Sequence, residues 1–148
     1  MRYTVIIFLL VSNLSIGQSV GFFTQYRPLA DSLSKVYNIP TCVILGVSYL
    51  ESGGGVSTVA KRLNNHFGIV GNCNFEVSKY KSRYRYYSKP EDSYVAFCEL
   101  VSRKKFYPLL KGSSDEKKWV RSIASTGYAA DANKWTAAVM RIINTKCH

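Results

Sequence analysis

The sequence predicts one mostly α-helical domain, with a helical body around one buried helix and a small β-lobe. Apolar residues recur at helical spacing over most of the chain, and a two-residue alternation replaces that spacing only between 74 and 87. The chain has 148 residues, 47% of them hydrophobic and 14% aromatic, which is apolar material for one compact core. A groove between such a body and such a lobe would suit a linear polymer.

The first residues are typical of a secretory signal peptide. Arg2 precedes an apolar run at 5–11, and the small residues Ser15 and Gly17 precede Gln18. The run is shorter than the roughly 20 residues that a membrane-spanning helix needs. We therefore expect 1–17 to be removed on export. The domain would then be 18–148, secreted or periplasmic, with no stable membrane insertion after cleavage.

Three helices are expected before the lobe. The first has an apolar stripe at Tyr26, Leu29, Ala30, Leu33 and Tyr37. Pro40 suits the first position of the second helix, which is apolar on nearly all sides from 41 to 51 and should be the buried central helix. Glycines at 53–55 end it, because glycine accepts a left-handed cap. A short third helix is expected at 57–63.

The alternation that follows predicts a β-hairpin or β-lobe, with tyrosines on one side and cations on the other. The two sides are Tyr80, Ser82, Tyr84 and Tyr86, and Lys79, Lys81, Arg83 and Arg85. Helices are expected again after capping boxes that begin at Ser88 and Ser113. Asp131 should cap a last helix, whose apolar stripe includes Trp135.

Charge and cysteine content bear on partners and compartment. Lysine and arginine number 20 against nine acids, a formal net charge of +11, which favours nucleic acid, anionic lipid or bacterial cell wall. The four cysteines are Cys42, Cys73, Cys98 and Cys147. One or two disulfides are expected and the pairing stays open; buried free thiols at Cys42 and Cys98 are the alternative. Without a C-x-x-C motif and with two histidines, neither a metal site nor a cofactor is expected.

Carboxylates are the best candidates for chemistry, because motifs for serine or cysteine nucleophiles and for phosphate loops are missing from the sequence. Most of the nine acids fit helix starts or face a basic residue four positions away. Glu51 instead ends an apolar helix, where the helix dipole and desolvation both raise a carboxyl pKa. A general acid for glycosidic cleavage needs such a pKa. The alternative for Glu51 is a solvated, frayed helix end, and for Glu76 a strand side chain that faces water.

Four ordered segments resemble the N-acetylglucosaminidase domain of glycoside hydrolase family 73, found in bacterial autolysins and the flagellar peptidoglycan hydrolase. They lie at 49–57, 64–69, 87–94 and 119–131. The resemblance covers roughly residues 22–143. It implies a lysozyme-like α+β fold and cleavage of the β-1,4 bond after N-acetylglucosamine in peptidoglycan.

The resemblance also implies roles for single residues. Glu51 matches the family's catalytic acid. Glu76 is the only acid between the N-H-F-G motif and the Ser88 capping box, where the family has its second carboxylate, so Glu76 takes that role. Tyr128 matches a tyrosine that lines the cleft, with a hydroxyl bonded to backbone as the alternative.

Further candidates for binding the glycan strand are Asn65, His66, Phe67, Tyr84 and Tyr86. For Asn65 and His66, support of their own loop is the favoured alternative. The tyrosines could stack on sugar rings. The competing interpretation is a solvated edge strand protected by its charges.

Three functions follow, in this order. The leading hypothesis is a peptidoglycan hydrolase that acts on glycan strands and not on nucleic acid, with Glu51 as its general acid. A non-catalytic glycan-binding domain is the alternative, because Gly54 and Val70 stand where the family usually has Trp and Lys. An exported nucleic-acid binder would rest on the Lys/Arg/Tyr strip alone. Lytic transglycosylases typically carry a Gly-Leu-Met-Gln run, which this sequence lacks.

Overall fold

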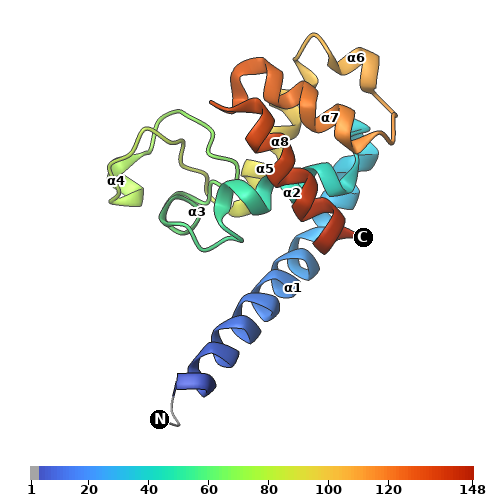
Figure 1. The fold of residues 1–148 in the computed structure, drawn as a ribbon. Helices are drawn as coiled ribbons and strands as arrows, with labels where there is room; N and C mark the ends of the chain where they lie inside the picture. Colours follow the sequence, from blue (N-terminus) through green and yellow to red (C-terminus); the bar gives the residue numbers. More distant parts are fainter. Residues whose placement is uncertain (1–3) are drawn as a thin grey trace.

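The computed structural model describes the backbone of residues 4–148 and the side chains of residues 21–148. Its elements are α1 (Thr4–Tyr37), α2 (Thr41–Ser52), α3 (Thr58–Leu63), α4 (Phe75–Ser78), α5 (Pro90–Ser102), α6 (Tyr107–Leu110), α7 (Glu116–Ile123), the π-helical turn η1 (Ala124–Tyr128), α8 (Ala132–Ile142) and the π-helical turn η2 (Ile143–Cys147) (Figure 1). The prediction of a mostly helical domain is confirmed.

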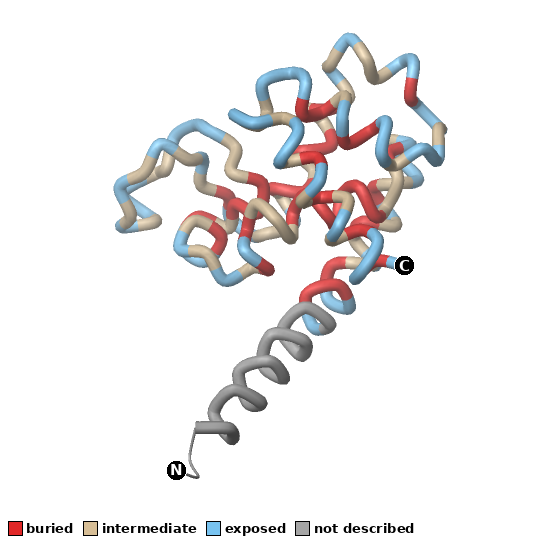
Figure 2. The backbone as a smooth tube through the Cα atoms, in the orientation of Figure 1, coloured by how far each residue is buried: buried red, intermediate tan, exposed pale blue. Residues whose placement is uncertain are grey.

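Helix α2 is the central element, as the sequence predicts. Every residue from Cys42 to Ser48 is buried, and α2 packs against α1, α5, α7 and α8. Figure 2 shows buried segments gathered where these helices meet. The helix ends at Gly53, whose φ of 59° is left-handed and whose N–H donates to Leu50. Glu51 is thereby fixed in the last turn of the most buried helix.

The first helix is longer than its predicted apolar stripe. It runs without a break through 17/18, the predicted cleavage position. The side chains of the predicted signal peptide lie outside the described residues, so its removal stays a prediction. In the described part of the chain, we find no helix with the length and apolar character that a membrane span needs.

The C-terminus is fixed to the core by a disulfide between Cys42, at the start of α2, and Cys147. Cys98 is a buried free thiol, and Cys73 is a partly exposed one. One disulfide thus forms where one or two were expected. The alternative of a free thiol applies to Cys98 but not to Cys42.

The predicted β-lobe is not confirmed. In the lobe segment, residues 64–87, Phe75–Ser78 form the short helix α4, and among the described residues one isolated antiparallel bridge joins Val70 to Tyr84. Asn74 and Lys79, which flank α4, have φ values of 47° and 52°. These left-handed positions turn the chain at both ends of α4 and prevent a continuous strand.

Extended backbone survives beside that bridge. Hydrogen bonds from Gly71 to Arg83 (3.0 Å), from Arg85 to Ile69 (2.8 Å) and from Tyr86 to Asn72 (2.9 Å) hold 69–72 against 83–86. The predicted alternation is present here, because the four cations of the strip are exposed and its tyrosines are half-buried.

Two helix starts differ from the predicted capping boxes. Helix α5 begins at Pro90, and neither Ser88 nor Lys89 provides a side-chain cap. Proline at the first helical position has a fixed φ that suits the helix start. Helix α7 is capped by Asp115, which accepts a hydrogen bond from the Lys118 N–H (2.9 Å), and not by Ser113. Asp131 caps α8 as predicted, accepting from the Lys134 N–H (3.0 Å).

Candidate active site

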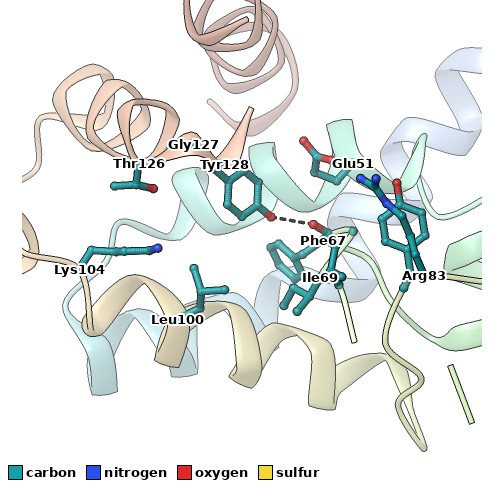
Figure 3. A pocket seen from close by; sticks show the side chains of 12 residues that line it. Glu51, Phe67, Ile69, Arg83, Leu100, Lys104, Thr126, Gly127 and Tyr128 are labelled. Carbon is teal, nitrogen blue, oxygen red and sulfur yellow. Dashed lines mark hydrogen bonds between the residues drawn. The ribbon is translucent and has the colours of Figure 1, made fainter. Parts of the chain in front are cut away.

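Glu51 lies between two hollows in the surface. The first, of about 400 Å³, is lined by Glu51, Phe67, Gly68, Ile69, Val70, Arg83, Tyr84, Leu100, Lys104, Thr126, Gly127 and Tyr128 (Figure 3). The second, of about 550 Å³, is lined by Leu50, Glu51, Tyr128, Ala129, Ala130, Asp131, Lys134, Trp135 and Ala138. Glu51 and Tyr128 line both hollows. The two hollows therefore form one groove that passes the carboxyl of Glu51.

The Glu51 carboxyl has a different neighbour at each oxygen. Oε1 accepts a hydrogen bond from Nε1 of Trp135 at 2.6 Å. Gly68 lies beside Oε2, since a Cβ added at this glycine would be 3.5 Å from that oxygen. Burial raises the pKa of Glu51 above its usual value, and the bond from Trp135 only partly opposes this. The carboxyl is thus biased toward keeping its proton, as the sequence predicts.

Trp135 is the contact that sequence reasoning missed. We expect it in the apolar stripe of the last helix, and its ring does lie against the core. Its indole N–H, however, points to Glu51, 84 positions earlier in the chain. A tryptophan that buries its ring usually finds a partner for that N–H, which is the one signal the sequence offers.

Tyr128 joins the two walls of the groove. Its hydroxyl donates to the carbonyl oxygen of Phe67 at 2.7 Å, which is the alternative named above, while the residue still lines both hollows. Burial raises the pKa of Tyr128, and the charge of Glu51 raises it further. The hydroxyl therefore stays protonated and acts as a hydrogen-bond donor. Gly127, with a φ of 79°, makes the turn that directs Tyr128 inward.

Asn65 is a buried clamp within the lobe segment. Its amide nitrogen donates to the carbonyls of Ile69 (2.9 Å) and Arg85 (2.8 Å). Its amide oxygen accepts from the N–H groups of Phe67 (3.3 Å) and Ile69 (3.1 Å). With these four bonds the amide is used by the loop itself, so the structure places Asn65 in the supporting role.

His66 is also a supporting residue, buried in an aromatic cluster. Its ring lies against Phe22, Tyr26 and Tyr94, and its Nδ1 is 3.4 Å from the Tyr94 hydroxyl. Burial lowers the pKa of His66 to about 4. The ring is therefore neutral near pH 7, and it lines neither hollow.

The three aromatic candidates divide between different surfaces. Phe67 is buried, stacks on Phe97 with ring centroids 4.3 Å apart, and contributes to the floor of the first hollow. Tyr84 lines the same hollow. Tyr86 lines a separate depression beside Asp92 and does not reach Glu51.

Glu76 lies outside the groove. It belongs to α4 and not to a strand, its side chain is 90% exposed, and its carboxylate is 3.9 Å from the Lys79 ammonium. Neither hollow includes it among its lining residues. Of the described residues that line the groove, Glu51 and Asp131 are the only acids, and Asp131 already caps α8.

One trio of side chains within 21–148 has the spacing of a metal site, namely Cys42, Glu116 and His148. The sulfur of Cys42 is bonded to Cys147, so it is not a thiolate ligand.

Sequence comparison gives one family. The family model described as mannosyl-glycoprotein endo-β-N-acetylglucosaminidase, a glucosaminidase, matches residues 27–147. No curated protein is similar enough in sequence to count as a match.

Solved structures share the fold. A mutant peptidoglycan hydrolase from Sphingomonas sp. A1 is 20% identical with a TM-score of 0.68, over 86% of this chain and 94% of that one. A truncated glycoside hydrolase domain of FlgJ from Salmonella typhimurium is 20% identical with a TM-score of 0.64, over 86% and 99%. A type VI secretion effector–immunity complex from Pseudomonas protegens contains a chain that is 17% identical with a TM-score of 0.64, over 88% and 95%.

Proposed function

Since the chain belongs to the glucosaminidase family of glycoside hydrolases, we propose that it hydrolyses the β-1,4 bond after N-acetylglucosamine in peptidoglycan, with Glu51 as the general acid. The observation that carries this proposal is the place of Glu51, a carboxyl of raised pKa at the middle of a groove open on both sides. Peptidoglycan is supported as the substrate by the similar hydrolases, whose names state it.

In the first step, the Glu51 carboxyl gives its proton to the glycosidic oxygen as the bond from that oxygen to the sugar C1 breaks. Positive charge develops at C1 and the ring oxygen. In the second step a water adds to C1, and the Glu51 carboxylate takes the proton that the water loses. Glu51 thus ends in its starting state.

Stabilising the charge at C1 needs a second group. Glu76 is our sequence-based candidate, although it projects into solvent from α4. The other candidate belongs to the substrate, because the oxygen of its N-acetyl group can attack C1 and form an oxazolinium that water then opens. The Glu76→Gln variant separates the two: a catalytic Glu76 predicts at least a 100-fold loss of kcat, and an acetamido route predicts no more than a twofold change.

Export to an oxidising compartment completes the proposal. The Cys42–Cys147 disulfide supports it, since such bonds are rare in proteins of the cytosol. The predicted signal peptide would deliver the enzyme to the cell wall.

The Glu51→Gln variant tests the function. We expect at least a 100-fold loss of reducing ends released from purified peptidoglycan, because glutamine cannot donate the proton. Glu99→Gln, in α5 and outside both hollows, is the matched control and should keep wild-type turnover. Mass spectrometry of the wild-type digest should find N-acetylglucosamine at the new reducing ends. Full activity of Glu51→Gln would contradict the proposal, and wall binding without turnover by the wild type would favour the glycan-binding alternative.

A further inference from the structure

The first hollow holds two cations that have no carboxylate partner. Arg83 and Lys104 line it, and Glu51 is the only acid among its described lining residues. Neither cation takes part in the ion pairs found among the described side chains. Lys104 is only partly exposed. A half-buried ammonium without an anion is costly, so an anion that enters the hollow would be favoured there.

The two cations come from different walls. Arg83 belongs to the extended part of the lobe segment, and its guanidinium lies 5.3 Å from the ring centroid of Tyr84. Lys104 follows the end of α5. Figure 3 shows them on opposite sides of the hollow, with Tyr128 between them and Glu51 close to the Arg83 side. A sugar bound beside Glu51 would therefore have a cation on either side.

We propose that Arg83 and Lys104 form an anion subsite that binds a carboxylate on the muramic acid residue of the strand. This inference rests on the proposed peptidoglycan hydrolysis. N-acetylglucosamine carries no charge, whereas muramic acid carries a lactyl ether that ends either in a free carboxylate or in a peptide with its own carboxylates. The subsite makes the enzyme prefer the wall strand over a neutral polymer of N-acetylglucosamine, and it sets which sugar lies on each side of the cleaved bond.

Substrate discrimination tests this subsite. The Arg83→Gln/Lys104→Met double variant should lose about 10-fold in kcat/KM on peptidoglycan strands. On neutral chitooligosaccharides it should lose less than twofold. The control is Lys81→Gln/Lys105→Met, which removes the same charge from exposed positions outside the hollow and should change neither value by more than twofold. Thermal melting should show that both variants are folded.

A binding arm keeps the test independent of which substrates are turned over. In the Glu51→Gln background, the two substitutions should weaken binding of soluble muramyl-containing strands by about 10-fold. They should leave chitooligosaccharide binding unchanged. Two strand preparations identify the carboxylate: losses on strands stripped of peptide assign the lactyl group, and losses only on peptide-bearing strands assign the peptide.

Three results would overturn the subsite: equal losses on neutral and muramyl substrates, no loss on either, or the same losses in the control pair. Failure of the underlying function has a different signature, because wild-type protein would then release no reducing ends from peptidoglycan.

Discussion

Glu51 carries two opposing effects on its proton. Its burial at the end of α2 disfavours the charged form, and the 2.6 Å bond from Trp135 favours it. Burial is the larger effect, so the pKa is raised. An enzyme that needs the protonated form then loses activity as the pH rises through that pKa.

Replacing Trp135 should move this pH limit. In Trp135→Phe the bond that stabilises the carboxylate is gone, so the pKa of Glu51 rises further and the alkaline limb of kcat against pH moves to higher pH. Trp119→Phe is the matched control, since the Trp119 indole donates to the Ser113 carbonyl at 2.9 Å, a partner outside the groove. It should lower the melting temperature and leave the limb in place. A limb that moves to lower pH in Trp135→Phe would contradict this account.

His66 should make the domain sensitive to acid. Its pKa is about 4 in the folded protein against an ordinary 6.5, so the unfolded chain binds a proton first as the pH falls. Stability is therefore fully present above pH 6.5 and is lost between pH 6.5 and 4. One pKa unit corresponds to about 1.4 kcal/mol, so the loss is about 3 kcal/mol.

Urea unfolding at several pH values measures this effect. Subtracting the free energy of His66→Gln from that of wild type should give a difference that shrinks by about 3 kcal/mol from pH 7 to pH 4. The exposed His148 supplies the control, because His148→Gln should keep the wild-type slope above pH 4. A pH-independent difference for His66→Gln would show that its ring is not held neutral.

At the scale of elements, the groove depends on contacts between parts of the chain far apart in sequence. The Tyr128 hydroxyl ties η1 to the lobe segment, 61 residues away, and the Trp135 indole ties α8 to α2. Both bonds join elements that line the groove, so they set its width beside Glu51.

Removing the Tyr128 hydroxyl should loosen the lobe segment. In Tyr128→Phe the Phe67 carbonyl loses its donor, which should cost about 1–2 kcal/mol of stability and raise KM more than it lowers kcat. Tyr107→Phe is a close match, because Tyr107 also donates to a backbone carbonyl, that of Tyr37 at 2.6 Å, outside both hollows. It should lose similar stability with unchanged kinetics. Equal kinetic effects in both variants would argue that Tyr128 acts only through stability.

Local patterns predicted what depends on local physics. The apolar run 41–51 gave the central helix, Gly53 its left-handed end, and the position of Glu51 the direction of its pKa shift. The lobe failed at Asn74 and Lys79, because their positive φ values are decided by the loop and not by the alternation. The bond from Trp135 to Glu51 depends on how α8 lies against α2, which no periodicity specifies.

At the scale of the whole molecule, the ends of the described core are joined covalently. The Cys42–Cys147 disulfide closes a loop of 105 residues that contains the groove, and Arg27 of α1 donates to the Cys147 carbonyl at 2.8 Å. Helix α2 thus has its N-terminal end linked to η2 and its C-terminal end beside the substrate groove. The bond and the site are at opposite ends of one rigid helix.

Breaking this disulfide should lower stability without changing the chemistry. A loop of this length constrains the unfolded chain strongly, so Cys147→Ser should lower the free energy of unfolding by about 4 kcal/mol. The kcat of the protein that remains folded should stay within twofold of wild type, because Glu51 keeps its contacts with Trp135 and Gly68. Cys73→Ser, which removes a free thiol, controls for the loss of a sulfur and should change neither value. If Cys147→Ser instead loses kcat at temperatures where it is fully folded, the two ends of α2 are coupled, and the site depends on the anchored C-terminus.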